Sequence, residues 1–187
     1  MNPLQPADIF ISCVSDDFEK QHARFPGFRS ALAAYLRRAD CHVKVQEDFR
    51  QEGAIDTIQK LANYVRHCRA VLHLVAKAKG AVPDQRDREA FLNSEPNFLQ
   101  ACPELRQQLG ECSDLTYTQW EAFLALHYGV NLFVYRSVDA HETQQTHLDR
   151  LTSVKRFPEQ FASDVDLLGK LIGDLRKILP NIPALKQ

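Results

Sequence analysis

The sequence predicts an α/β fold in which a parallel sheet is covered by helices on both faces. Short apolar runs alternate with amphipathic helical segments along the whole chain. Several of the apolar runs are continuous, which is typical of strands buried on both faces of a parallel sheet. Alternation of strands and helices indicates right-handed βαβ crossovers. At 187 residues the chain is long enough for one domain with a substantial core.

The first half of the chain contains three of the expected strands. Residues 8–14 (DIFISCV) form an apolar run, and residues 70–76 (AVLHLVA) are the most continuously apolar segment. Apolar side chains recur at helical spacing between these runs. The expected order is strand 8–14, helix 27–39, strand 42–47, helix 55–65 and strand 70–76.

Residues 77–112 are the least regular part of the chain. Glycine and proline residues interrupt the segment repeatedly, and only a short amphipathic piece is expected at 98–109. A connection much longer than about 12–15 residues usually has a function of its own. We interpret this segment as an insertion that covers a cleft.

The second half of the chain completes the alternation. Trp120, Phe123, Leu124 and His127 share one helical face, and Gly129 is a suitable helix stop. The elements expected after this helix are a buried strand at 130–135, a helix at 143–151, a short edge strand at 154–157 and a final helix at 165–179. We therefore predict one domain over 1–180, with 181–187 as a tail or the start of a linker.

Composition excludes several classes of protein. Hydrophobic residues make up 44% and charged residues 25%, which is ordinary for a globular chain and excludes a disordered or fibrous one. The 23 basic and 24 acidic side chains are balanced, so nothing favours nucleic acid or an anionic membrane. The sequence has no apolar run long enough to span a membrane and no secretory signal at its start. A cytoplasmic location is expected.

Cysteine and histidine residues show no metal-ligand spacing. The five cysteines include no Cys-x-x-Cys pair, and three lie in or beside apolar segments, so reduced and buried thiols are expected. His42, His67 and His73 fall in predicted regular elements, and we interpret them as structural or surface residues. No metal ion is expected.

Glu121 is the candidate catalytic residue. It lies in the first turn of the predicted helix, among aromatic neighbours and ahead of a buried strand. Open α/β sheets bind ligands beyond the carboxyl ends of their strands, so a carboxylate at the entrance of such a unit can face a cleft. The alternative is structural, because Thr118 and Glu121 have the spacing of a capping box.

Two polar turns follow strands in the first half of the chain. Ser15 begins the turn after residues 8–14, where it can contact a ligand or cap a helix. The loop 48–53 (DFRQEG) follows the second strand, and its Asp48 and Arg50 are candidates to contact a ribose or a phosphate. A solvated turn is the alternative for this loop.

Four segments, taken together, resemble the Toll/interleukin-1 receptor (TIR) domain in its bacterial form. They are DIFISCVSDD at 8–17, EDF at 47–49 with Gly53 beyond it, IQKLANYVRHCRAVLHLVA at 58–76 and YTQWEAFLALHYGVNLFVY at 117–135. The resemblance covers most of the chain. It implies a flavodoxin-like three-layer fold with a five-stranded parallel sheet, self-association into homo-oligomers and, in many members, cleavage of NAD at its nicotinamide–ribose bond.

The resemblance also assigns site residues. Glu121 matches the family's catalytic glutamate, and the family's mobile loop corresponds to 48–53. Many members carry a Trp-Cys pair a few residues ahead of the glutamate, whereas here Trp120 directly precedes it. The residues expected to bind substrate are Phe10, Ser12 and Ser15 in the segment that lines the nucleotide cleft, with Asp48, Phe49, Arg50, Tyr117 and Trp120.

One carboxylate suffices in principle for this chemistry. Nicotinamide joined to ribose is a cationic pyridinium that leaves as a neutral molecule, so it needs no general acid. A carboxylate near the ribose stabilises the oxocarbenium-like transition state. Glu121 is expected to act directly or by holding ribose hydroxyls, with Trp120 or Phe10 stacked on a ring and 48–50 closing over the nucleotide.

Three functions are compatible with the sequence, and the fold does not decide between them. The leading one is a TIR effector domain that cleaves NAD when copies assemble, as the output module of a bacterial immune or signalling protein with a sensor domain or subunit. The others are a non-catalytic TIR adaptor and a nucleoside deoxyribosyltransferase-like enzyme. In the leading interpretation NAD is the substrate, no cofactor is needed, and neither nucleic acid nor a membrane is a direct partner.

Overall fold

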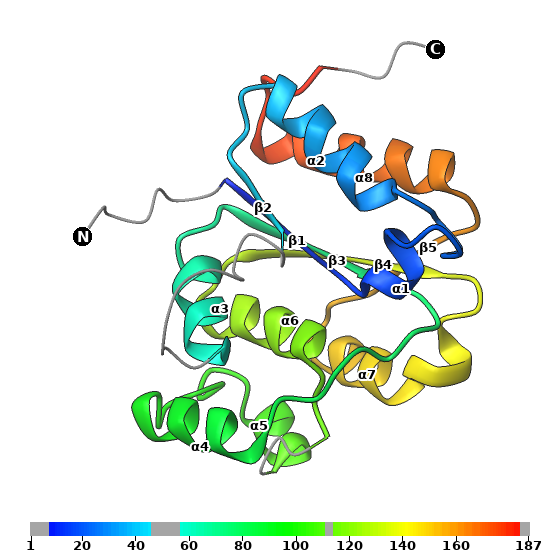
Figure 1. Cartoon of the computed structure of the whole chain (residues 1–187). Helices are drawn as coiled ribbons and strands as arrows, with labels where there is room; N and C mark the ends of the chain where they lie inside the picture. Colours follow the sequence, from blue (N-terminus) through cyan, green and yellow to red (C-terminus); the bar gives the residue numbers. More distant parts are fainter. Residues whose placement is uncertain (1–7, 46–56, 111–113, 184–187) are drawn as a thin grey trace.

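The computed structural model describes residues 8–45, 57–110 and 114–183 of the chain (Figure 1). Among these residues, the centre of the fold is a five-stranded parallel sheet with the order β2-β1-β3-β4-β5. The strands are β1 (Ile9–Cys13), β2 (Val43–Val45), β3 (Ala70–Val75), β4 (Asn131–Ser137) and β5 (Glu159–Phe161). This sheet confirms the prediction of a parallel, flavodoxin-like α/β fold.

Helices cover both faces of the sheet (Figure 1). One face is covered by α1 (Ser15–Phe18), α2 (Phe28–Arg38) and α8 (Asp164–Ile178). The other face is covered by α3 (Thr57–Val65), α6 (Tyr117–His127) and α7 (His141–Ser153). Two further helices, α4 (Gln85–Ser94) and α5 (Pro103–Leu109), form an outer layer against α3 and α6.

The strands alternate their side chains between two hydrophobic cores. In β1, Ile9 and Ile11 pack with α2 and α8, whereas Phe10 packs with the helices on the opposite face. All five residues of β1 and all six of β3 are buried. The continuous apolar runs in the sequence therefore correspond to central strands that have a core on each side.

Helix α6 begins earlier than the sequence pattern suggested. Thr116 is its N-cap and forms a capping box with Gln119, whose side-chain oxygen accepts the Thr116 N–H at 3.2 Å. Thr118 and Glu121 therefore do not form the capping box that their spacing allowed. Glu121 lies in the second turn rather than the first, and its side chain is buried.

The segment 77–112 is more regular than we predicted. It contains α4 and α5, and its buried side chains join the core of α3 and α6. Phe98 stacks on Trp120 with ring centroids 5.2 Å apart, and Phe91 meets the same indole edge-on at 5.5 Å. As a result α6 is buried around most of its circumference instead of along one face.

Strand β5 begins at Glu159, two residues after the end of the strand predicted at 154–157. Residues 154–157 do not form a strand, because Lys155 has φ = 59°, a left-handed conformation that a strand excludes. The backbone N–H of Arg156 instead donates to the carbonyl of Leu151 at the end of α7. Packing also continues past residue 180, where Ile182 is 2% exposed in the core formed with α2 and α8.

Candidate functional site

The candidate site lies at the carboxyl ends of β1 and β3, where the order of the sheet reverses direction. The helix after β1 covers one face, whereas α3, which precedes β3, covers the other. Open α/β sheets place ligands at such a switch point. The amino-terminal turn of α6 reaches this point, because the hydroxyl of Ser12 on β1 lies 3.4 Å from the carbonyl oxygen of Thr118.

Glu121 follows Thr118 by one helical turn and is 1% exposed. Successive side chains turn by about 100° around a helix, so Glu121 points between the directions of Tyr117 and Thr118. Tyr117 points towards α3 and α4, where its hydroxyl donates to Asp87 at 3.3 Å. The backbone carbonyl of Thr118 contacts β1, whereas its hydroxyl lies 3.1 Å from that of Thr116. Glu121 is therefore buried on the side of α6 that lies between Tyr117 and Thr118.

Three predicted site residues lie outside the described part of the chain. They are Asp48, Phe49 and Arg50, which belong to the connection between β2 and α3. Their assignment to a ribose or phosphate contact remains a prediction.

Phe10 and Ser12 do not line an open cleft. Both side chains are fully buried, at 0% exposure. Phe10 packs in the core with α3 and α6, and the hydroxyl of Ser12 hydrogen-bonds with Nδ1 of His73 at 2.9 Å. We expected both to contact a nucleotide, and the structure instead places them beneath the surface because helices cover this part of the sheet.

Ser15 is the predicted cleft residue that keeps some exposure. It begins α1, and its hydroxyl accepts a hydrogen bond from Nη1 of Arg29 at 3.3 Å. Arg29 is 4% exposed and also lies 3.6 Å from the carboxylate of Glu19. The burial of Arg29 could not be predicted from the sequence, because an arginine in an amphipathic helix usually faces solvent.

Trp120 has a structural role in this conformation. Its indole is fully buried between Phe91 and Phe98, and the stack with Phe98 occupies one face of the ring. We expected Trp120 to stack on a substrate, but its indole is not available for this contact in the described structure. Tyr117 is partly exposed, and burial raises the pKa of its hydroxyl, so this group stays protonated and donates to Asp87.

The first part of the 77–112 segment crosses the carboxyl ends of the central strands. We call residues 77–83 the crossing segment. The N–H of Ala78 donates to Asp17 at 2.7 Å, and the carbonyl of the same residue accepts from Gln144 at 2.7 Å. The Tyr117 N–H donates to the carbonyl of Ala81 at 2.9 Å. These bonds connect the crossing segment to α1, α6 and α7, so it lies across this edge of the sheet.

Gly80 fits the crossing segment into a narrow space. Its φ is +79°, and a Cβ atom at this position would lie 3.2 Å from Cγ2 of Val14 at the end of β1. Burial raises the pKa of Asp17, whereas the hydrogen bond from Ala78 acts in the opposite direction. The crossing segment therefore depends on a small residue and a buried carboxylate.

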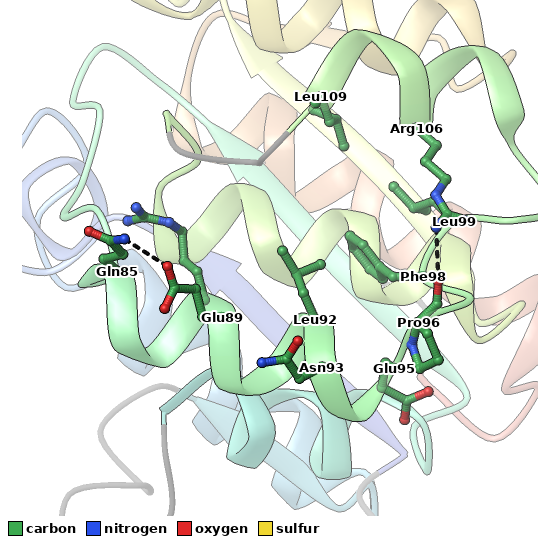
Figure 2. Close-up of a pocket in the computed structure, with 12 residues that line it drawn as sticks. Gln85, Glu89, Leu92, Asn93, Glu95, Pro96, Phe98, Leu99, Arg106 and Leu109 are labelled. Atoms are coloured by element: carbon green, nitrogen blue, oxygen red, sulfur yellow. Dashed lines mark hydrogen bonds between the residues drawn. The ribbon is translucent and has the colours of Figure 1, made fainter.

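A cavity of about 670 Å³ lies in the outer helical layer, between α4, α5 and the turn at 95–99. Figure 2 shows the side chains that line it. Its volume is in the range of small-molecule pockets. Leu92 and Phe98 supply apolar walls, whereas Glu89 and Arg106 supply charges of opposite sign. This mixture indicates no single class of ligand.

Comparison of the chain with known protein families and with curated proteins finds no match. In the described ranges, no group of three or more His, Cys, Asp or Glu side chains is arranged to hold a metal ion. Likewise, no helix in the described part of the chain is both long and apolar enough to cross a membrane. The fold and the site therefore carry the functional argument.

Proposed function

We propose that this chain cleaves NAD at the nicotinamide–ribose bond, in the manner of the TIR domains that it resembles. The observation that carries the proposal is the position of Glu121, 1% exposed in the second turn of α6 and one turn from the contact with β1. Burying a carboxylate costs free energy. Since Thr116 and Gln119 already cap this helix, capping does not account for Glu121.

The proposed chemistry uses the charge of Glu121. As the bond to nicotinamide breaks, positive charge develops on the ribose, and a carboxylate in a site shielded from water stabilises that charge strongly. Water then attacks the ribose carbon and releases a proton, so the products are nicotinamide, ADP-ribose and H⁺. The leaving nicotinamide takes both electrons of the broken bond and needs no acid.

The resemblance further supports activation by self-association. In that case a neighbouring copy completes the substrate site, and the rate per molecule rises with protein concentration. Nicotinamide release should be measured over a wide concentration range, together with the molecular mass in solution. Constant specific activity in a protein that stays monomeric would contradict this part of the proposal.

The decisive test is Glu121→Gln, which removes the charge and keeps the shape. Turnover should fall by roughly 10²-fold or more, a barrier increase of about 2.7 kcal/mol. The matched control is Glu104→Gln, the same change at an exposed position of α5, which should leave turnover unchanged. Thermal unfolding of each variant shows whether the fold is intact. Near-normal turnover in Glu121→Gln would remove the catalytic assignment.

A non-catalytic scaffold is the second candidate. It is favoured by the crossing segment over the strand ends and by the full burial of Phe10 and Ser12. A scaffold would assemble at high concentration without releasing nicotinamide. The same experiment therefore separates the two functions.

A further inference from the structure

Two buried histidines extend the contact between Ser12 and Thr118 into a longer chain of hydrogen bonds. Ser12 and His73 are paired residues on β1 and β3, and Oγ of Ser12 lies 2.9 Å from Nδ1 of His73. On the far side of the same ring, Nε2 of His73 lies 2.8 Å from Nε2 of His147 on α7. The chain thus runs from α6 through two strands to α7.

The two imidazole rings are hydrogen-bonded rather than arranged around a metal ion. Their centroids are 5.0 Å apart, close to the largest separation that the 2.8 Å nitrogen–nitrogen distance allows. The lone pair of one Nε2 therefore points along the line to the other nitrogen, which is the geometry of an N–H···N bond. A shared metal ion would require both lone pairs to point away from that line.

The histidine pair is neutral. Both side chains are 2% exposed, and burial lowers the pKa of His73 to about 3 and the pKa of His147 well below its ordinary value. Arg150, one turn along α7, further opposes protonation of His147. A neutral imidazole carries one proton, so each ring has one donor nitrogen and one acceptor nitrogen.

The contact with Thr118 selects one direction for the chain. If Ser12 donates its hydroxyl proton to the Thr118 carbonyl, it must accept from Nδ1–H of His73. His73 then accepts at Nε2 from Nε2–H of His147. In the reverse direction Ser12 donates its only hydroxyl proton to Nδ1 of His73. No proton then lies between the Ser12 hydroxyl oxygen and the Thr118 carbonyl, so that hydrogen bond is not formed. The first direction forms one more hydrogen bond and is preferred on that ground.

The first direction leaves Nδ1 of His147 as an acceptor. This buried atom has no hydrogen-bond partner among the described residues. His147 lines a cavity of about 10 Å³ together with His73, Gln144 and the amino-terminal turn of α6. A cavity of this size holds at most one water molecule. Gln144 is already bonded to Gln119 and to the Ala78 carbonyl.

We propose that one water molecule binds in this cavity and donates to Nδ1 of His147, and that Ser12, His73 and His147 are positioning residues for the turn of α6 that precedes Glu121. The water fixes the tautomer of His147, which fixes the tautomer of His73. His73 in turn leaves the Ser12 hydroxyl free to hold the Thr118 carbonyl. The positioning role rests on the proposed function of Glu121, whereas the water and the tautomers do not.

The first experiment reads the tautomers directly. Two-bond ¹H–¹⁵N correlation spectra at neutral pH should show the proton of His73 on Nδ1 and that of His147 on Nε2. A high-resolution crystal structure should show a water molecule within about 3 Å of Nδ1 of His147. The opposite pair of tautomers, or a dry cavity, would overturn the proposed chain.

The second experiment tests positioning with matched variants. Ser12→Ala removes the bond to Thr118, and His147→Leu removes the donor to His73. Each should lower the kcat of NAD cleavage by roughly 10- to 100-fold with little change in KM, because a misplaced catalytic group slows the chemical step. His147→Gln keeps an N–H donor at the same end of the side chain and should retain most of the kcat.

A packing control separates positioning from stability. Leu148→Ala truncates the residue after His147 on α7, which is 5% exposed in the core shared with α3 and α6. The change removes none of the side chains in the hydrogen-bonded series. It should lower the free energy of unfolding and leave kcat unchanged. If Leu148→Ala lowers kcat as much as His147→Leu, or if Ser12→Ala is fully active, the positioning role is wrong. If the wild type releases no nicotinamide, the proposed function fails, and the spectra still decide on the tautomers and the water.

Discussion

The buried histidine pair should make the protein sensitive to mild acid. His73 and His147 are neutral in the folded state because burial lowers both pKa values. In the unfolded chain each ring titrates near its ordinary pKa of 6.5. Below that pH the unfolded state binds more protons than the folded state, so the free energy of unfolding falls as the pH falls. The effect begins near pH 6.5 and continues to about pH 3, where His73 itself titrates.

The magnitude for His73 follows from its ordinary pKa, because its folded-state pKa of about 3 lies far below the working range. At pH 5.5 His73 contributes a loss of about 1.4 kcal/mol, and at pH 5 about 2 kcal/mol. His147 adds a loss in the same direction, because burial lowers its pKa as well. A typical domain has only about 5–15 kcal/mol of stability, so the loss is a large fraction of it.

Urea unfolding at several pH values between 5 and 7.5 measures this dependence. Ordinary carboxylates titrate near pH 4, below this window. Asp17 acts in the opposite sense, because burial raises its pKa and the folded state takes up its proton first. His147→Gln should reduce the slope, since one of the two buried histidines is removed. A control at an exposed, non-titrating position of the same helix, Thr146→Ser, should leave the slope unchanged.

Two results would refute the reasoning. One is a free energy of unfolding that is the same at pH 7.5 and pH 5.5. The other is a slope that His147→Gln does not change, since the titrating groups would then lie elsewhere.

Three further substitutions test the packing around the site by urea unfolding. Trp120→Ala should lower the free energy of unfolding by about 3–5 kcal/mol, because it empties the space between α6 and the α4–α5 layer; a loss below about 1 kcal/mol would mean that the layer is not firmly packed. Gly80→Ala should lower the free energy of unfolding by about 1–3 kcal/mol, because φ is +79° and the new methyl group meets Val14 at 3.2 Å. An unchanged free energy of unfolding would contradict the described path of the crossing segment. Asp87→Ala should cost about 1–3 kcal/mol and speed hydrogen exchange of the Ile58 amide, which donates to this carboxylate at 3.1 Å, whereas Asp87→Asn should keep part of the bond.

The strands and crossover helices could be predicted because each carries a strong local pattern. The central strands β1 and β3 are buried on both faces, and their sequences are correspondingly apolar throughout. Helix α4 escaped prediction because its sequence, QRDREAFLNS, is mostly polar and buries only Asp87 and Phe91. The position of β5 depends on how α7 ends at Lys155, a backbone conformation that no hydrophobic pattern reports.

The site was harder to predict because its contacts join residues that are far apart in the sequence. The position of Glu121 in the sequence made it a candidate, and the resemblance favoured catalysis over helix capping. The structure assigns the capping box to Thr116 and Gln119, and the catalytic role of Glu121 stays a prediction. Trp120 has the residue type of a stacking platform, but its partner Phe98 comes from a segment that we had interpreted as a covering loop. A single histidine in an apolar strand was the only signal for His73, and nothing local pointed to His147, 74 residues away.

The outer layer of α4 and α5 changes what kind of element α6 is. In a three-layer sandwich the helix that carries Glu121 would have one solvent-exposed face. Such a helix could tilt or shift when its surroundings change. Here α4 and α5 cover that side, so α6 is packed between the sheet and a second layer of helices. An engineered chain that trimmed residues 85–109 would leave Trp120 facing water. If the chain is activated by self-association as proposed, we expect the neighbouring copy to act at the amino-terminal end of α6 rather than along the length of the helix.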